Sequence, residues 1–122
     1  MIVKANAMFT YVTKIRSVKM THLITPEFTN LFENNQVYSQ EENKDPLIIA
    51  KLFDTFGSAS WFLTEYDPEE KIAFGYVTGL AQDEWGYVSL TELESIKHQA
   101  FGIPRIERDL YFTPTSFSKV IN

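Results

Sequence analysis

Acidic side chains are the residues of this chain whose types and spacing could do chemistry. Glu65 and Asp67 stand two apart near the end of one predicted strand, and Glu107 and Asp109 stand two apart in another. Alternate residues of a strand share a face, so each pair would present its carboxylates together. If the pairs met, they could divide acid and base roles or hold a hard cation such as Mg²⁺. Arg108 supports the competing interpretation, a structural ion pair with Glu65 or Asp109 of small net energy.

Other catalytic patterns are weaker. Asp54 with Glu69-x-Lys71 has the acid, acid-x-lysine order of metal-dependent nucleases, but the triplet falls in a predicted turn instead of a strand. The two histidines, His22 and His98, accompany no Gly-x-Ser-x-Gly motif and are interpreted as surface residues. The chain has no cysteine and no histidine pair with ligand spacing. We therefore assign no catalytic residue, no metal and no cofactor from the sequence.

Aromatic residues indicate a different kind of site. The chain holds 10 Phe, 6 Tyr and 2 Trp, more than one core of this size readily hides. Amphipathic rings beside acids are typical of contact patches for a protein partner, whereas the alternative is that they pack beneath helices on a sheet. The candidates for partner binding are Tyr66, Tyr76, Trp85, Tyr87 and Tyr111.

Charge narrows the classes of partner. The formal net charge is −5, but residues 1–20 carry four basic residues and no acid, so residues 21–122 carry seven basic and sixteen acidic residues. An acidic body repels phosphate backbones, and no direct nucleic-acid binding is expected except through the N-terminal segment. No apolar run approaches the roughly 20 residues that span a bilayer. With cysteine absent as well, we predict a cytoplasmic protein without a membrane partner.

Two segments of different character divide the chain. Residues 1–19 form a basic extension in which polar residues interrupt the apolar run that a secretory signal needs. We expect this extension to be disordered or to add an edge strand over Met8–Thr13. Residues 20–122 are expected to form a single domain, and Met20 is a natural alternative start.

The predicted fold is organised around one hairpin. Two runs of aromatic and β-branched residues, Trp61–Tyr66 and Ile72–Val77, are joined by the turn signal Asp67-Pro68. The most apolar run, Leu47–Phe53, predicts a strand covered on both faces or near the middle of the sheet.

Capping signals mark the helices. Thr25-Pro26-Glu27 is a helix start, and Ser89 with Glu92 has the capping-box spacing. These elements predict an α+β fold, one antiparallel sheet of four to six strands with two or three short helices mainly on one face. The remaining predicted elements are a helix from Thr25 to Asn34, a strand over Trp85–Val88, a helix over Ser89–Lys97, a strand over Ile106–Phe112 and a short helix over Thr115–Ile121.

Four motifs in order resemble one family. They are Leu63-Thr64-Glu65 with Asp67-Pro68; Ala73-Phe74-Gly75; Gly86-Tyr87-Val88-Ser89-Leu90 with Glu92-Leu93-Glu94; and Ile106-Glu107-Arg108-Asp109-Leu110 with Phe112. The chain resembles, from about Leu23 onward, a domain-of-unknown-function family of small bacterial proteins often encoded on plasmids, conjugative elements and phage. It departs from the family near His98 to Ala100, where a glycine is usual. The resemblance implies no activity, cofactor or catalytic residue; it implies the company of mobile-element genes, where accessory and anti-defence proteins are common.

Two functional hypotheses from different classes follow. The first is a non-enzymatic accessory protein of a mobile element that binds another protein. This class includes an anti-defence inhibitor that imitates DNA, if its acids line up at phosphate-like spacing on one surface. The alternative is a small carboxylate-dependent, metal-assisted enzyme using Glu65, Asp67, Glu107 and Asp109. The partner and the oligomeric state are open, and the order of the strands decides whether Glu65 meets Arg108.

Overall fold

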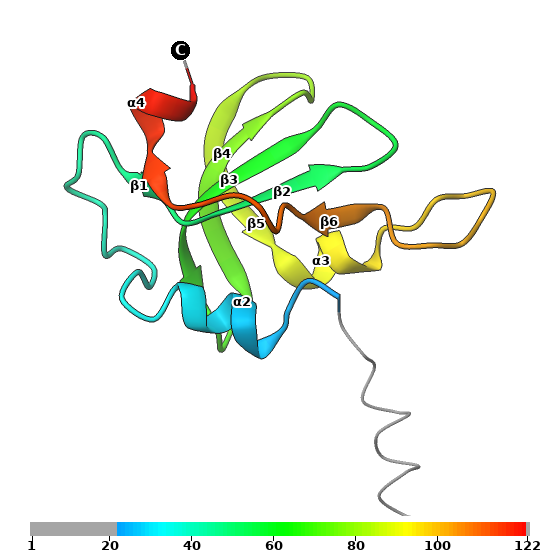
Figure 1. Cartoon of the computed structure of the whole chain (residues 1–122), viewed down its shortest axis with the longest axis horizontal. Coiled ribbons are helices and arrows are strands. Elements are labelled where there is room, and N and C mark those ends of the chain that lie inside the picture. The colour runs from blue at the N-terminus through cyan, green and yellow to red at the C-terminus, as the bar shows by residue number, and fades with distance from the viewer. Residues whose placement is uncertain (1–21, 122) are drawn as a thin grey trace, which may run out of the picture.

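The computed structural model of the protein describes residues 22–121, which form an antiparallel α+β fold (Figure 1). Five strands form the main sheet in the order β5-β4-β3-β2-β6, and β1 pairs with β7 in a separate two-stranded sheet. The α+β class is confirmed, whereas the expected single sheet is wrong. The elements in chain order are α2 (Pro26–Leu31), β1 (Leu47–Ile48), β2 (Ala50–Asp54), β3 (Ser60–Asp67), β4 (Ile72–Thr78), β5 (Glu84–Ser89), α3 (Leu90–Ser95), β6 (Ile106–Arg108), β7 (Thr115–Ser116) and α4 (Phe117–Val120).

The predicted hairpin is confirmed as β3 and β4, the longest strands of the main sheet. Its turn is built by Asp67, whose Oδ1 accepts hydrogen bonds from the backbone N–H groups of Glu69 and Glu70 at 2.9 and 3.3 Å. Lys71 closes the turn with a φ of 58°, in the left-handed region. The Asp67 carboxylate therefore stabilises the turn itself, at the edge of the fold.

The apolar run at residues 47–53 does not form one strand. Leu47 and Ile48 pair with β7, while β2 starts at Ala50 and pairs with both β3 and β6. Between them, the backbone N–H of Ile49 donates to the carbonyl of Leu63 at 2.8 Å. The chain therefore passes from one sheet to the other at this point, and Ile48, Ile49 and Ala50, the residues at the crossing, are buried.

The last main strand is shorter than its alternating pattern predicts. β6 ends at Arg108, because Asp109 begins a turn in which its Oδ1 accepts from the backbone N–H of Tyr111 at 3.0 Å and its carbonyl accepts from Phe112 at 3.2 Å.

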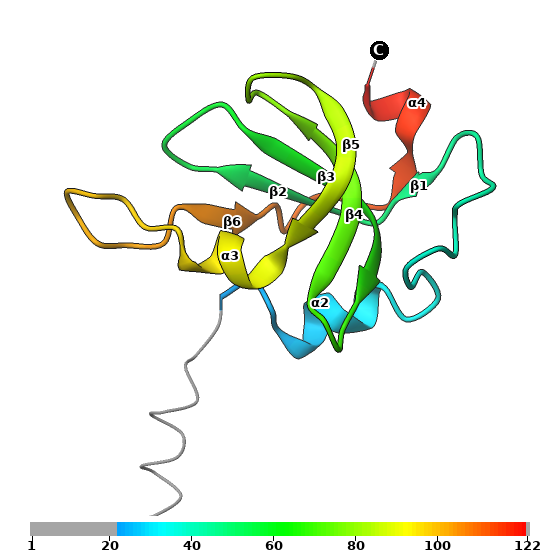
Figure 2. The same ribbon diagram turned by 180° about the vertical axis from the view of Figure 1, so that it is seen from behind.

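Helices α2 and α3 lie on one side of the main sheet, and α4 lies on the other side in both views (Figures 1 and 2). The expected placement of the helices on one face is therefore only partly met. Both predicted caps form: Thr25 Oγ1 accepts from the N–H of Phe28 at 3.0 Å, and Ser89 Oγ accepts from that of Glu92 at 3.1 Å.

The core lies between α2, α3 and the sheet. The rings of Phe28 and Phe32 pack against that of Tyr66, with centroids 5.0 and 5.6 Å away, and all three side chains are buried. No helix within residues 22–121 is long and apolar enough to cross a membrane. The expected extension over residues 1–19 lies outside the described residues.

Candidate functional site

Strand β4 presents different side chains to the two faces of the main sheet. Ala73 and Val77 alternate with Phe74 and Tyr76, and only the first two belong to the core under the helices. Phe74 and Tyr76 therefore point to the face that α2 and α3 leave uncovered, which we call the open face. A cluster of partly exposed rings gathers there.

Cross-strand pairing assembles this cluster. Tyr87 of β5 stands opposite Phe74, and Trp85 stands opposite Tyr76, with ring centroids 4.8 and 5.2 Å apart. Trp85 also stacks on Phe74 at 5.7 Å with an interplanar angle of 11°. Phe117 of α4 packs at one end, 4.8 Å from the ring of Trp85. Rings from two strands and a helix thus form one surface.

A β-bulge brings a carboxylate to the same face. The register of β3 against β4 shifts between Leu63 and Glu65, so that Leu63 faces Gly75 and Glu65 faces Phe74. Unbroken alternation would have placed Glu65 with Leu63, on the core side. The extra residue, Thr64, reverses the alternation and places Glu65 beside the rings of the open face.

The Glu65 carboxylate holds a loop over this face. Its Oε1 accepts from the backbone N–H of Tyr38, and its Oε2 accepts from that of Gln40, both at 2.8 Å. Glu65 is only 4% exposed. Among residues 22–121, the ion pairs within 4 Å involve other acids, Asp54, Glu27 and Glu94, so no basic side chain neutralises Glu65.

Gln40 fastens the same loop through its side chain. Its Nε2 donates to the carbonyls of Leu47 and Thr64 at 2.9 and 3.0 Å, and its Oε1 accepts from the N–H of Leu47 at 2.7 Å. Tyr38 sits at the bend with a φ of 76°. The loop therefore has a defined position and forms a wall beside the rings.

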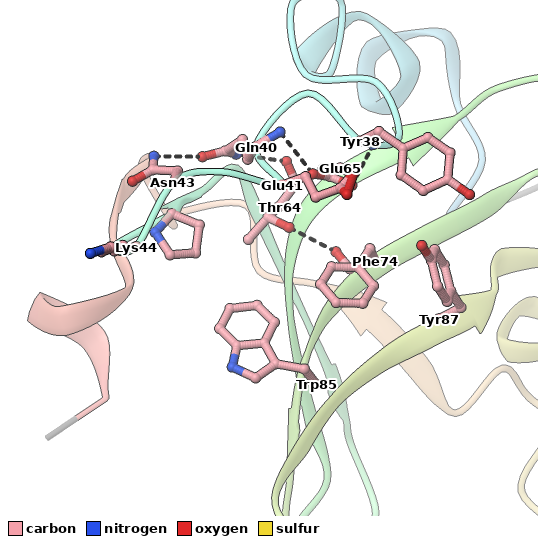
Figure 3. Close-up of a pocket in the computed structure, with 11 residues that line it drawn as sticks. Tyr38, Gln40, Glu41, Asn43, Lys44, Thr64, Glu65, Phe74, Trp85 and Tyr87 are labelled. Carbon is pink, nitrogen blue, oxygen red and sulfur yellow. Dashed lines mark hydrogen bonds between the residues drawn. The ribbon is translucent and has the colours of Figure 1, made fainter.

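A pocket of about 420 Å³ lies between this loop and the open face (Figure 3). Its walls combine aromatic rings with two carboxylates, and the rings of Tyr38, Phe74, Trp85 and Tyr87 border the same space. Desolvation, together with the neighbouring Tyr38 hydroxyl, raises the pKa of the Tyr87 phenol. The lining residues are Tyr38, Gln40, Glu41, Asn43, Lys44, Pro46, Thr64, Glu65, Phe74, Trp85 and Tyr87.

The predicted carboxylate cluster is dispersed. Arg108 bonds to Glu27 of α2 at 2.7 Å, which corrects the expected pairing with Glu65 or Asp109. Strand β2 lies between β6 and β3, which carries Glu65, and Arg108 stands opposite Leu52, a core residue, so its side chain is on the helix side. Glu107 stands opposite Phe53 in the register of β2 and β6.

The remaining acids bond to groups near their own strands and turns. Asp67 and Asp109 each shape their own turn. Asp54, at the end of β2, makes a two-pronged pair with Arg105 at 2.9 Å for each bond, and the whole length of β3 separates it from the turn that holds Glu69 and Lys71. This separation removes the nuclease-like arrangement.

The two histidines also have structural partners. His22 Nε2 donates to the carbonyl of Ile106 at 2.8 Å, and His98 packs its ring on Phe56 and Phe101. Within residues 22–121 no group of three or more acids and histidines is placed to hold a metal ion.

The five predicted aromatic residues separate into two groups. Tyr76, Trp85 and Tyr87 come together on the open face. Tyr66 is fully buried between α2 and the sheet, its hydroxyl has no hydrogen-bond partner within residues 22–121, and burial raises its pKa. Tyr111 is 95% exposed but follows β6, at the opposite edge of the sheet from β5.

Sequence reasoning missed eight of the lining residues: Tyr38, Gln40, Glu41, Asn43, Lys44, Pro46, Thr64 and Phe74. Phe74 could have been found, because it alternates with Tyr76 along one predicted strand and the next predicted strand carries Trp85 and Tyr87. Thr64 lines the pocket at the bulge of β3, and the others lie in a connection whose position depends on a hydrogen bond from Gln40 to Glu65 across 25 residues. No local signal reports such a contact.

Comparison with known proteins identifies the family and no activity. No curated protein matches the chain, and no solved structure matches it. One family model matches residues 23–120, nearly all of the described chain, and its description is "Protein of unknown function (DUF2958)". The chain therefore belongs to the DUF2958 family.

Proposed function

We propose that this protein is a non-enzymatic binding protein whose open face receives a protein partner. The observation that supports the proposal is the aromatic cluster of the open face: Phe74, Tyr76, Trp85 and Tyr87 share one surface, and Tyr87 is 55% exposed. Aromatic residues contribute large apolar contact areas and are enriched where proteins bind each other. A pocket beside them can anchor a projecting side chain.

The enzyme hypothesis lacks a comparable arrangement. It requires carboxylates that approach one another, and the acids proposed for it shape separate turns or belong to different parts of the sheet. Glu65 and Asp67 line two different pockets within residues 22–121, and neither pocket combines two of these acids. We therefore base no proposal on acid and base catalysis.

The biological setting that we propose is an accessory role in a mobile element, as the family resemblance implies. An anti-defence activity within that role would be measured as increased survival of phage or incoming plasmid in a host that expresses the protein. Loss of that effect in open-face variants would connect the activity to the proposed surface.

A capture experiment tests the binding function. Tagged wild type and the variant Trp85→Ala/Tyr87→Ala would be exposed to host extract, and any retained protein would be purified and titrated back. The matched control is Phe101→Ala/Tyr111→Ala, which removes two exposed rings, 68% and 95% exposed, outside the pocket. Circular dichroism and thermal unfolding establish that each variant folds.

We expect one partner to bind saturably to wild type and to the control, and at least tenfold more weakly to the open-face variant. Equal binding to all three proteins would show that the partner uses another surface. Failure to obtain any saturable partner from the native host would count against the binding function itself.

A further inference from the structure

We propose that the pocket of the open face binds an arginine side chain presented by the partner. The inference rests on the proposed function, because the partner supplies the arginine. Its structural basis is the combination of ring faces and unneutralised carboxylates in one cavity.

The buried carboxylate favours a cation. Glu65 is nearly inaccessible, and within residues 22–121 its carboxylate accepts two hydrogen bonds, both from backbone N–H groups. Each carboxylate oxygen has a second lone pair, and a buried charge gains most from a charged donor. A ligand without positive charge would leave Glu65 as it is, whereas a guanidinium would complete its charge balance.

The rings favour the same class of ligand. Trp85, Phe74 and the two tyrosines border the pocket, and aromatic faces attract cations within about 6 Å. The open face already contains one such contact, since Lys51 Nζ lies 5.5 Å from the centroid of Phe62. Arginine suits the site better than lysine because its planar group stacks on rings and donates two parallel hydrogen bonds.

Two charged residues at the mouth adjust the affinity in opposite directions. Glu41 lines the pocket and would attract an arriving cation, whereas Lys44 lines it and would repel one. Glu41 and Lys44 are both exposed. The nitrogen of Lys44 lies on the outer side of the residues that line the pocket, away from Trp85 and Tyr87 (Figure 3). The repulsion from Lys44 is thus screened by water.

The test uses a small probe in place of the partner. N-acetyl-arginine methylamide would be titrated into the ¹⁵N-labelled full chain and followed by NMR shifts, including that of the Trp85 indole N–H, with the citrulline analogue as the neutral probe of nearly equal shape. We expect saturable shifts confined to the pocket, and about tenfold weaker binding of the citrulline probe.

Charge variants provide matched controls. Glu41→Gln should weaken arginine binding severalfold, Lys44→Gln should strengthen it, and Glu42→Gln, a neighbour outside the pocket, should leave it unchanged. Glu65→Gln is a poor choice, because its amide would direct N–H groups at a backbone N–H of Tyr38 or Gln40 and release the loop.

Three results would overturn the inference: equal binding of the citrulline probe, shifts centred away from the pocket, or no saturation at the solubility limit of the arginine probe. In each case the proposed function would still hold if the capture experiment yields a partner whose binding depends on Trp85 and Tyr87. Conversely, if the arginine probe binds but no captured partner depends on Trp85 and Tyr87, the proposed function is wrong and the pocket is a cation site only.

Discussion

The two faces of the main sheet use aromatic residues in opposite ways. On the helix side, Phe28 and Tyr66 are fully buried, and their rings are 5.0 Å apart in edge-to-face contact. On the open face, Tyr87 and Trp85 make ring contacts of the same length, yet Tyr87 remains more than half exposed. The difference is the cover: among the described residues, α2 and α3 close one face, whereas the other is partly covered by α4 and by the loop that Glu65 holds, which are bonded to each other through Asp45 and Ser118.

This comparison shows that strand composition does not decide which face is functional. β4 supplies small and aliphatic residues to the closed face and aromatic residues to the open one. The large rings of the open face support one another, as the stacked Phe74 and Trp85 do. The closed face should therefore determine stability, and the open face should determine binding.

The largest expected effect comes from opening a cavity in the closed face. Phe28→Ala removes a fully buried ring and should lower the free energy of unfolding by about 3–5 kcal/mol. Trp85→Ala removes a partly exposed ring and should cost less than half as much, because water can fill the space. Guanidinium unfolding of both variants measures the difference. Equal costs would show that the open face is part of the core.

A matched pair of glycines tests how closely the strands approach. A Cβ on Gly75 would lie 2.3 Å from the carbonyl oxygen of Phe62, so Gly75→Ala should destabilise the protein by about 1–3 kcal/mol. Gly86 stands opposite Gly75 on β5 and has nothing within 4 Å of its Cβ position, so Gly86→Ala should be neutral or slightly stabilising. Chemical denaturation of the two variants gives the values. If both tolerate alanine, the tight contact of β3 with β4 is not what fixes the bulge.

Local chemistry explains what could be predicted from the sequence. The caps of Thr25 and Ser89 and the turn at Asp67 depend on residues within three positions, and all three form. The hairpin and the α+β class follow from such signals together with strand patterning.

Long-range pairing explains what could not be predicted. The break at Ile49 depends on a second sheet formed with residues near the C-terminus, and the bulge at Thr64 depends on the register against β4. The pocket requires both the bulge and the loop that Glu65 holds, so Glu65, Trp85 and Tyr87 could be named in advance as candidates, but not as one site. The order of the strands, which separates Arg108 from Glu65, carries no local signal either.

An acid titration measures how much the ion pair of Asp54 and Arg105, at the end of β2, contributes to stability. Hydrogen bonds from Arg105 lower the pKa of Asp54, so the folded state binds its proton less readily than the unfolded chain. The pair therefore stabilises the fold above the unfolded pKa of about 3.9, and this contribution is lost as the pH falls through the lower folded value. Urea unfolding across this acidic range should show a flatter pH profile for Asp54→Asn than for wild type. Arg105→Gln should flatten it equally, and an unchanged slope in both variants would assign the acid sensitivity to other groups.

The smallest expected effect concerns the cover of the open face. Asp45 accepts from the backbone N–H and the hydroxyl of Ser118 at 2.9 and 2.7 Å, and this fixes the start of α4, which carries Phe117. Asp45→Ala should accelerate hydrogen exchange at Ser118 and broaden the NMR signals of Phe117, with little change in the midpoint of global unfolding, because exposed contacts of this kind open locally. Asp45→Asn retains an acceptor and should restore most of the protection. If exchange is unchanged in the alanine variant, the ring contacts of Phe117 and the pairing of β7 with β1 hold α4 without Asp45, and the open face is more firmly covered than the Asp45 bonds indicate.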